Sequence, residues 1–259
     1  MTRDDLKQLL IENGLERHAE TLAADALQAI QLFPSEAVVK NAPIGASKFG
    51  GNPDLPRDFE WQSHNGKPLT FLAQFELKRL KRYDVDSLLP PDGRLYFFYD
   101  VAGFAQGNED DAGTHFQILY VPADVPVLPK LHPKDVPMLP SRTIEFDNIW
   151  TLPDIDPNDL ETYDDDELDA FDDVIDILWQ EDSPHHQLLG HAESIQGTVE
   201  DEVAQIAGEG NWRLLLQLDS DMDYLNHTWG DLGSLYFCIR EEDLQQANFN
   251  KGWMLMQGA

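Results

Sequence analysis

A seven-residue segment with an alternating pattern occurs in the first third of the chain and again near its end. The first copy runs from Thr70 to Glu76 (TFLAQFE), and the second runs from Arg213 to Asp219 (RLLLQLD). In both copies apolar residues occupy alternate positions, while a leucine, a glutamine and an acid lie on the opposite face, which is the period of a β-strand. We therefore expect two central strands built on the same plan.

The neighbourhood of each copy repeats as well. Residues 93–97 (GRLYF) match residues 233–237 (GSLYF), and residues 188–191 (LLGH) resemble residues 49–52 (FGGN). An ordered set of such matches indicates a degenerate two-fold duplication. We expect a β-rich α+β fold, internally duplicated, with antiparallel or mixed sheets sharing one core, an N-terminal helical pair and an inserted acidic helix.

We expect the whole chain, residues 1–259, to form a single globular unit. Its expected parts are an N-terminal helical flank (1–37), a first β repeat (38–121), a proline-rich connector with an acidic helix (122–182) and a second β repeat (183–259). In the flank, Thr2 and Asp5 predict a capping box at the start of one helix, and a second helix is predicted from Leu15 to Ile30.

Charge and cysteine content limit the kind of protein this can be. The 48 acidic residues against 18 basic ones give a net charge of −30, which argues against nucleic acid and anionic membranes as partners. The start of the chain lacks the pattern of a signal peptide, and no apolar run is long enough to span a membrane. A single cysteine, Cys238, rules out an intramolecular disulfide. We expect a cytoplasmic protein.

The acidity is concentrated in one region. No Lys or Arg occurs between Arg142 and Arg213, and Asp and Glu are abundant there. Within it, apolar residues from Leu168 to Leu178 have helical spacing. The other face of this predicted helix carries six acids: Asp165, Asp166, Asp169, Asp172, Asp173 and Asp176. We expect these six to form an acidic surface that contacts another protein, which is a basic protein in the inhibitor hypothesis below.

Motifs in both halves resemble those of one family. In the first half they are residues 49–56 (FGGNPDLP), Trp61, residues 68–74 (PLTFLAQ), 89–93 and 95–98; in the second half they are residues 186–190, 195–197, 212–219, 229–233 and 235–239. Together they resemble the YwqG-like proteins, a bacterial family named as a domain of unknown function. Gln62 and Ala192 depart from it, since the family tends to have Pro at both positions. The resemblance implies a cytoplasmic β-rich α+β fold with internal pseudo-symmetry, and no established activity.

Six residues are candidates for a binding site. Gln74 and Gln217 are polar residues within the two repeated strands, where a buried amide needs hydrogen-bond partners for its oxygen and its nitrogen. They either flank a shared cleft or tie down neighbouring glycine loops. The other candidates lie near predicted strand ends, where pockets form: His191, Gln196, Trp229 and Asp231. Asp231 alternatively caps its own turn.

Metal sites have little support in the sequence. His185, His186 and His191 lack the spacing of a zinc site, and no cysteine cluster accompanies them. Residues 154–165 resemble a calcium-binding loop in part, but Pro157 and Asp159 break its pattern. We expect no metal and no cofactor. The oligomeric state is not defined by the sequence.

Three functions remain compatible with these observations. We favour a non-catalytic binding or interaction protein that uses its acidic surface, because the sequence contains no nucleophile elbow, phosphate loop or dinucleotide fingerprint. The first alternative is a hydrolase-like enzyme with a cleft at the repeat interface, in which His191 and Asp231 cooperate. The second alternative is an acidic inhibitor or immunity protein that blocks a basic partner.

Overall fold

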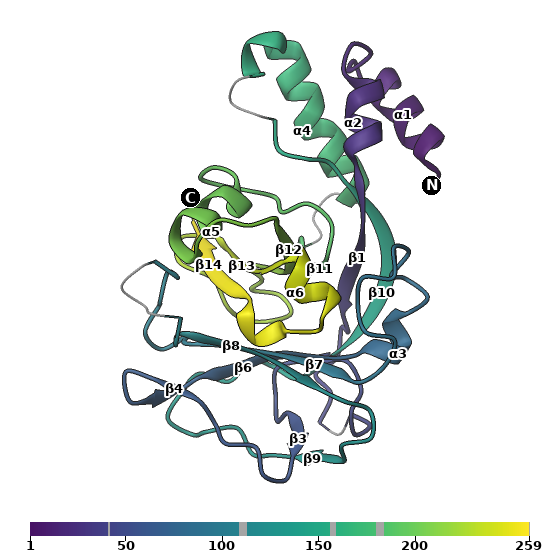
Figure 1. The fold of residues 1–259 in the computed structure, drawn as a ribbon. Helices are drawn as coiled ribbons and strands as arrows, with labels where there is room; N and C mark the ends of the chain where they lie inside the picture. The colour runs from purple at the N-terminus through teal and green to yellow at the C-terminus, as the bar shows by residue number, and fades with distance from the viewer. Residues whose placement is uncertain (41, 109–112, 156–158, 180–183, 259) are drawn as a thin grey trace.

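The computed structural model describes residues 1–40, 42–108, 113–155, 159–179 and 184–258. Ten strands of this described part form one sheet, in the order β14-β13-β12-β11-β1-β10-β2-β6-β7-β8, and every neighbouring pair is antiparallel. The sheet is strongly curled, so that β12, β13 and β14 lie over β6, β7 and β8, while β1 and β10 run along one side (Figure 1). The β-rich α+β fold expected from the sequence is therefore confirmed.

The N-terminal segment begins as predicted and then departs from the prediction. Helix α1 (Arg3–Glu12) starts at a Thr2–Asp5 capping box. Helix α2 (Ala19–Asp25) ends at Asp25, and β1 (Leu27–Pro34) follows it as a central strand. The predicted helix from Leu15 to Ile30 is wrong in its last part. Strands β10 and β11 both hydrogen-bond to β1, and this pairing overrides the helical spacing of the apolar residues.

Each half of the sheet contributes four strands. Those of the first half are β2 (Lys48–Phe49), β6 (Thr70–Glu76), β7 (Arg94–Tyr99) and β8 (Phe116–Val121). Those of the second half are β11 (Gln187–Leu188), β12 (Trp212–Asp219), β13 (Ser234–Arg240) and β14 (Trp253–Gln257). The two halves meet at β1 and β10 (Arg142–Thr151), which pair with each other.

Other elements cover the outer faces of the two halves. The pair β3 (Asp54–Pro56) with β9 (Val127–Pro129) and the hairpin of β4 (Ser63–His64) and β5 (Lys67–Pro68) lie beside the first half. Helix α5 (Val199–Ala207) packs on the second half. Shorter helical turns are α3 (Leu77–Leu80), η2 (Leu160–Thr162), α6 (Glu241–Gln245) and η3 (Phe249–Lys251).

Strand register confirms the internal duplication. Gln74 lies opposite Tyr96 in the β6–β7 pair, and Gln217 lies opposite Tyr236 in the β12–β13 pair. Both pairs also carry a bulge two residues before the glutamine, because the register shifts between Phe71 and Ala73 in one half and between Leu214 and Leu216 in the other. Two strands that share both register and bulge are built on one plan.

The main core lies between the two layers of the curled sheet. Phe97 and Phe237, which occupy equivalent positions in β7 and β13, are both fully buried, and their ring centroids are 5.0 Å apart. Cys238 is buried on the opposite face of β13, as its alternation with strand residues predicts.

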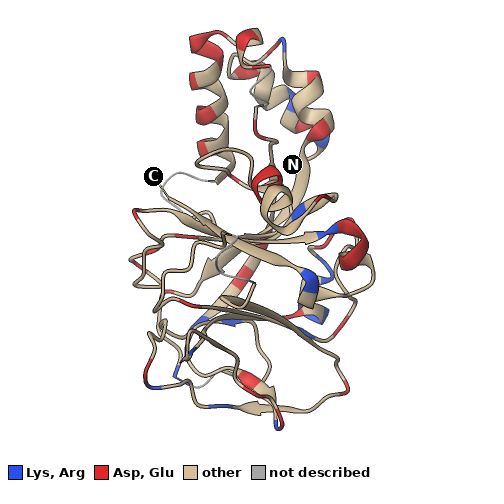
Figure 2. Ribbon diagram, turned by 60° about the vertical axis from the view of Figure 1, so that its left-hand side comes forward, with Lys and Arg blue, Asp and Glu red and all other residues tan. Residues whose placement is uncertain are grey.

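Helices α1, α2 and α4 (Asp165–Trp179) pack together at one end of the molecule, above β1 and β10 (Figure 1). The predicted acidic helix is thus confirmed, with Phe171, Val174 and Leu178 buried against β10 and the other helices. All six aspartates of the acidic surface are exposed, and acidic residues run along α4 in Figure 2. Among the described residues, no helix is long and apolar enough to cross a membrane.

Candidate functional site

Gln74 ties a loop to the first half of the sheet. Its side-chain oxygen accepts a hydrogen bond from the N–H of Asp54 at 2.8 Å, and its nitrogen donates to Ala46 O and to the Asp54 carboxylate, both at 2.8 Å. The Tyr96 hydroxyl donates to the carbonyl of Asp54. The side chains of Gln74 and Tyr96 therefore hold Asp54, which follows β2, and Gln74 also holds Ala46, which precedes it.

Gln217 does the same in the second half. Its oxygen accepts from the N–H of Glu193 at 3.0 Å, and its nitrogen donates to His185 O at 3.2 Å. The Tyr236 hydroxyl donates to the carbonyl of Glu193. Glu193 is thus the counterpart of Asp54. Both glutamines are fully buried and satisfied by backbone groups, which favours the loop-tying interpretation over ligand contact.

The turn after each short strand approaches the central strands very closely. Gly51 and Gly190 both adopt positive φ, at +68° and +77°, where side chains are strained. A Cβ on Gly51 would lie 2.6 Å from the Cβ of Ser141, and one on Gly190 would lie 2.6 Å from the Cβ of Ala29. The equivalence of the halves therefore extends into β1, β10 and the segments that flank them.

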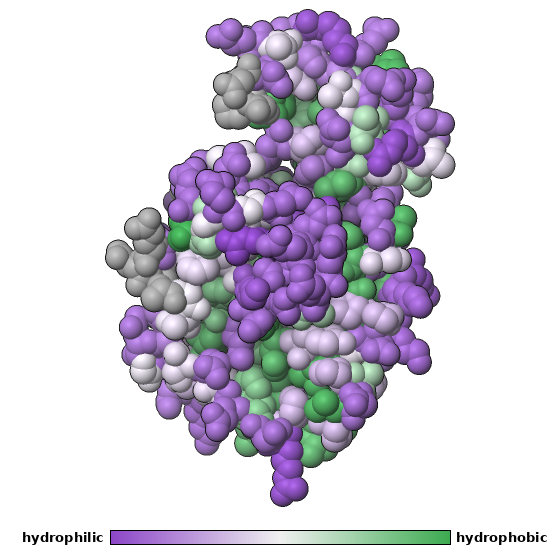
Figure 3. Space-filling model, in the orientation of Figure 1, coloured by the Kyte–Doolittle hydropathy of each residue, from purple (hydrophilic) through white to green (hydrophobic). Residues whose placement is uncertain are grey.

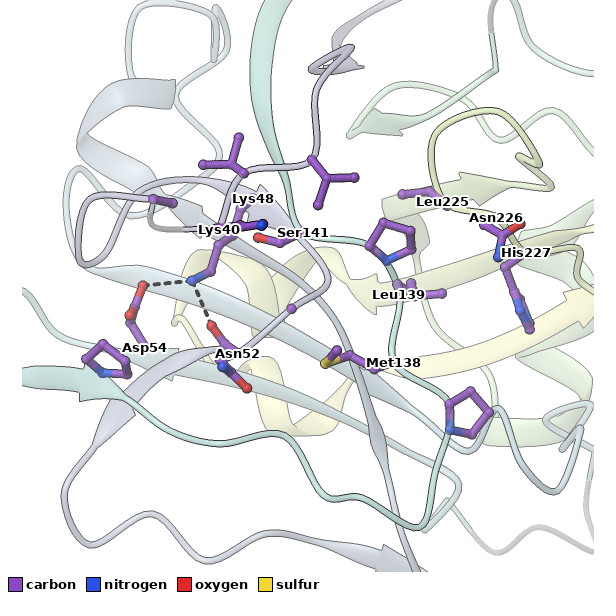
Figure 4. Close-up of a pocket in the computed structure, with 17 residues that line it drawn as sticks. Lys40, Lys48, Asn52, Asp54, Met138, Leu139, Ser141, Leu225, Asn226 and His227 are labelled. Atoms are coloured by element: carbon purple, nitrogen blue, oxygen red, sulfur yellow. Dashed lines mark hydrogen bonds and ion pairs between the residues drawn. The ribbon is translucent and has the colours of Figure 1, made fainter.

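A groove of about 700 Å³ opens beside this turn in the first half (Figure 4). Three parts of the chain form it: the segment after β1, the loop after β2, and the extended residues that precede β10. A loop from the second half closes one side. Its lining includes Val38, Lys40, Lys48, Asn52, Met138 and His227. The groove is therefore made by both repeats.

A buried ion pair forms one end of the groove. The Lys48 ammonium lies 2.7 Å from Asn52 O and 3.2 Å from the Asp54 carboxylate, and both charged side chains are buried. An ammonium has three N–H donors. Two of them have these partners, and the described residues contain no partner for the third. Lys48 can therefore offer one hydrogen bond to the groove.

Arg142 holds the two sides of the groove together. Its guanidinium donates to carbonyls of Ser35 and Glu36, just before the segment that carries Val38 and Lys40, and to carbonyls of Asp223 and Tyr224, just before the loop that carries His227. Arg142 is itself buried. Neutral carbonyl partners on both sides make it a clamp between the repeats.

A histidine–aspartate pair shapes the loop from the second half. His186 Nδ1 accepts from the N–H of Asp219, so its Nε2 carries the proton and donates to Asp221 at 3.2 Å. The other Asp221 oxygen accepts from the N–H groups of Asp223 and Tyr224. Burial raises the pKa of Asp221, but these hydrogen bonds outweigh it and keep the pKa below its ordinary value. The pair is fully buried and acts on loop shape.

His227 lines the groove and has a buried nitrogen that is unpaired in the described structure. Its Nε2 is buried and, among the described residues, has no hydrogen-bond partner. Burial also lowers the pKa of His227, so the ring is neutral at pH 7. The ring packs on Trp229, with centroids 4.5 Å apart. This nitrogen is therefore enclosed by the protein and unpaired within the described part of the chain.

Exposed apolar side chains surround the groove. Val38 is 54% exposed and Met138 is 59% exposed, although both line it. Ile44, Leu128 and Leu131, in neighbouring segments, are also exposed. Figure 3 shows hydrophobic surface gathered over the lower part of the molecule, where the β3–β9 pair lies, while the end with α4 is mostly hydrophilic. Clustered apolar exposure of this kind marks interaction sites.

The second half has a counterpart of this groove, and α4 fills it. A cavity of only about 30 Å³ remains there, lined by Gln187, His191 and Glu193, the equivalents of Lys48, Asn52 and Asp54. The segment after β10 supplies another wall, as the segment after β1 does in the groove. The remaining lining comes from Phe171, Ile175, Leu178 and Trp179 of α4.

The candidate residues from the sequence are not brought to one site. His191 bonds to Asp25 O and lines the filled cavity, whereas Asp231 lies in an exposed turn. No hydrogen bond or ion pair joins these two in the described structure. Gln196 is exposed, and its N–H donates to Gln257. Trp229 is buried behind His227. A binding role for these residues stays a prediction.

The histidines considered for a metal site have separate partners. His185 pairs with Glu193, His186 pairs with Asp221, and His191 contacts Asp25 O. The described residues contain no group of three side chains arranged to hold a metal ion. Part of the calcium-like segment, residues 156–158, lies outside the described residues.

Sequence reasoning missed the groove, although its parts were visible. The Gly-rich residues 49–56 and the proline-containing residues 135–140 (DVPMLP) provide much of the lining. The first segment indicates the duplication and the family resemblance, but its pattern does not predict a groove. What the sequence does not show is that these segments meet the loop at 225–227.

Comparison with known proteins gives one match. A family model described as a domain of unknown function (DUF1963) matches residues 47–258, which include both halves of the sheet and most of the groove. No curated protein matches the chain.

Proposed function

The chain belongs to the DUF1963 family, whose function is unknown, and from this premise we propose that it is a non-catalytic binding protein that receives a segment of another protein in the groove between its repeats. One observation carries the proposal: both repeats build an open concavity of about 700 Å³ that is rimmed by exposed apolar side chains. Binding sites are typically concave and apolar with a few fixed polar groups. Here those groups are Lys48 and Asn52.

The groove has the features of recognition rather than of catalysis. Lys48 is held by Asp54 and Asn52, and His227 contacts Trp229, so neither polar group is paired with a nucleophile. Catalytic bases are normally hydrogen-bonded to the group that they activate. The hydrolase-like alternative is less well supported, because no described hydrogen bond or ion pair joins His191 and Asp231.

Site-specific photocrosslinking tests the proposal. A photoreactive amino acid at Met138 should crosslink one defined partner in host cells, whereas the same probe at Leu232, an exposed apolar residue outside the groove, should not. Adding Val38→Glu should reduce the Met138 crosslink at least about tenfold, because a buried unpaired charge opposes binding. Equal crosslinking from both sites, or a crosslink unaffected by Val38→Glu, would reject the groove as the binding site.

The acidic surface of α4 supports a second binding site, for a basic partner. Its six aspartates are exposed, and among the described residues none of the six forms an ion pair with a base. Burial and neighbouring Asp176, Asp169 and Asp173 raise the pKa of Asp172, which shows that like charges are crowded there. This second site also suits the inhibitor or immunity function.

Salt dependence tests this second site. A pull-down at low salt should recover basic proteins that are lost near several hundred millimolar salt, where the Debye length falls to about 4 Å. Replacing the six aspartates by Asn should abolish the recovery. Recovery that survives these replacements would assign the charge to solubility.

We also propose that the chain is a YwqG-like protein and that it is located in the cytoplasm. The ordered motifs in residues 49–56 and 212–219 support membership of the YwqG-like proteins. The net charge of −30 supports a protein partner in the cytoplasm over nucleic acid or an anionic membrane. Fractionation of the native cell would test the location.

A further inference from the structure

The filled cavity of the second half indicates what the open groove accepts. Strand pairing fixes the equivalence: β1 pairs with β11 through Ile30 and Leu188, and β10 pairs with β2 through Arg142 and Phe49. Because Leu188 and Phe49 are equivalent, Ile30 corresponds to Arg142. β1 therefore corresponds to β10, and the segment that follows β1 corresponds to the end of β10 and the residues after it.

The two linings share walls under this equivalence. Trp150, Thr151 and Leu152, at the end of β10 and just after it, line the filled cavity, and Val38, Val39 and Lys40, in the segment after β1, line the groove. With the equivalent loops after β2 and β11, two of the walls are therefore the same. The main difference is the segment that lies on them, which is α4 in one half and no part of the described chain in the other.

We propose that the groove binds an amphipathic helix of a partner protein, in the position that α4 takes in the second half. This inference rests on the proposed function of the groove. The side chains of α4 that reach its cavity are Phe171, Ile175, Leu178 and Trp179, which lie on one face of the helix. The partner helix presents apolar residues at this spacing, in the helix-in-groove mode of recognition.

Charge differences define the polar side of the partner helix. Gln187 of the filled cavity is replaced by Lys48 in the groove, and the segment after β1 adds Lys40. Lys40 is exposed at the rim, and Lys48 has one N–H free of described partners. Because Asp54 neutralises Lys48, the charged lining residues leave one net positive charge, that of Lys40, within a chain of net charge −30. A carboxylate flanking the apolar face is the complementary group.

An added β-strand fits this groove less well than a helix. Strand addition needs an open strand edge. β2 already pairs with β10 on one side and β6 on the other. On the segments beside it, Val39 N–H donates to Ser141 O and Gly51 N–H donates to Leu139 O. The groove floor therefore has its strand hydrogen bonds in use.

The chain supplies its own probe for this proposal. A fluorescent synthetic peptide with the sequence of Asp165–Trp179 carries the required apolar face and acids. Its binding to the full-length protein is measured by fluorescence anisotropy. Two peptide variants differ in helix content at an exposed position: Asp173→Pro breaks the helix, and Asp173→Asn has the same charge change and preserves it.

The expected results test separately whether the peptide binds as a helix, whether it binds in the groove and whether the charge of Lys40 contributes. The Asp173→Asn peptide should bind at least about tenfold more tightly than the Asp173→Pro peptide, because proline disfavours the helix. The protein variants Lys40→Glu and Met138→Glu should each weaken binding at least about tenfold. Lys81→Glu is the matched control, since Lys81 is an exposed lysine outside the groove, and it should change affinity less than twofold.

The contrary results have distinct meanings. Equal binding of the Pro and Asn peptides, sensitive to Met138→Glu, would overturn the helix proposal and leave a peptide-binding groove. Binding that Lys81→Glu weakens as much as Lys40→Glu would overturn it as general charge attraction. Absence of binding by the peptide would overturn it as well, and the crosslinking at Met138 would then decide whether the groove has any partner.

Discussion

At equivalent positions beside the central strands, the first half of the sheet has Lys48 and Asp54, and the second half has Gln187 and Glu193. In the first half the two side chains form a buried ion pair that faces an open groove. In the second half Glu193 pairs with His185, and α4 covers the position. The two halves therefore use the same backbone frame for different purposes.

This comparison distinguishes residues that fix the backbone shared by the two halves from residues whose side chains face the groove or α4. Each half has a buried glutamine, a tyrosine opposite it and a left-handed turn, and these groups bond the backbone. The side chains that differ are those projecting from the frame toward the groove or toward α4. Function is then expected to depend on the side chains that differ, although one of them, Lys48, also supports the fold through its buried ion pair.

The largest expected difference in unfolding free energy is between Lys48→Met and the substitution at the equivalent position, Gln187→Met. Lys48→Met leaves the buried Asp54 carboxylate without its cation, which should cost about 3–5 kcal/mol of unfolding free energy. Gln187→Met removes one hydrogen bond to His191 O and an oxygen without a described partner, which should cost about 1 kcal/mol or less. Urea unfolding measures both. Similar costs would mean that the ion pair is not a distinguishing feature of the first half.

The next prediction compares the filled cavity with the open groove. Phe171→Ala removes a buried ring from α4 and should cost about 3–4 kcal/mol. Met138→Ala in the groove should change stability by less than about 0.5 kcal/mol, because Met138 is largely exposed. Thermal and urea unfolding of the two variants test this. A large loss for Met138→Ala would show that the groove side chain supports the fold rather than a ligand.

A difference in the pH dependence of stability between the halves arises from helix α5, which packs on the outer face of the second half. Burial, with Asp154 and Asp201 nearby, raises the pKa of Glu200 from 4.5 to about 7, although Arg213 opposes this. The folded state therefore holds a proton that the unfolded state has released between pH 4.5 and 7. Stability should fall as pH rises through this window, by about 2–3 kcal/mol at most.

The variant Glu200→Gln should remove most of this dependence and stabilise the protein at pH 8. Unfolding free energies from pH 4 to pH 8 provide the measurement, with exposed Glu242→Gln as the control. A wild-type stability that rises over this window, with Glu200→Gln unchanged, would contradict the assignment. The first half should show no such effect, since residues around β3 and β9 cover its outer face with apolar groups.

The sequence predicted the features that local pattern determines. Alternation located β6 and β12, and the repeated motif around Gln74 and Gln217 gave the duplication, which strand register confirms. The spacing of Phe171, Val174 and Leu178 gave the buried face of α4. These patterns depend on residues close together in the chain.

Features that depend on distant pairing were not predicted. Residues 27–30 have apolar positions that suit a helix, but they join β1 because β10 and β11 are available on both sides. The groove needs Arg142 to join the segments near Ser35 and Tyr224, which are far apart in sequence. Nor does the sequence show that α4 lies on the second half and leaves the first half open.

The smallest predicted effect concerns the outer face of α4. Asp176 lies in the last turn of α4 (Asp165–Trp179), where the helix dipole disfavours negative charge, while Asp172 and Asp173 lie in its middle and have acids at helical spacing. Each like-charge pair should cost roughly 0.2–0.5 kcal/mol. Asp165 and Asp166, in the first turn, gain from the dipole instead. The fold does bring a base to α4, but Arg17 pairs with Asp164 and Glu167 and leaves the six aspartates without it.

The triple variant Asp172→Asn, Asp173→Asn, Asp176→Asn should therefore be slightly more stable at low salt, and the difference should shrink at high salt. Thermal melting at both salt concentrations measures it. A triple variant that melts below the wild type at low salt would show that these carboxylates have favourable partners, and α4 would then owe part of its position on the second half to charge as well as to its apolar face.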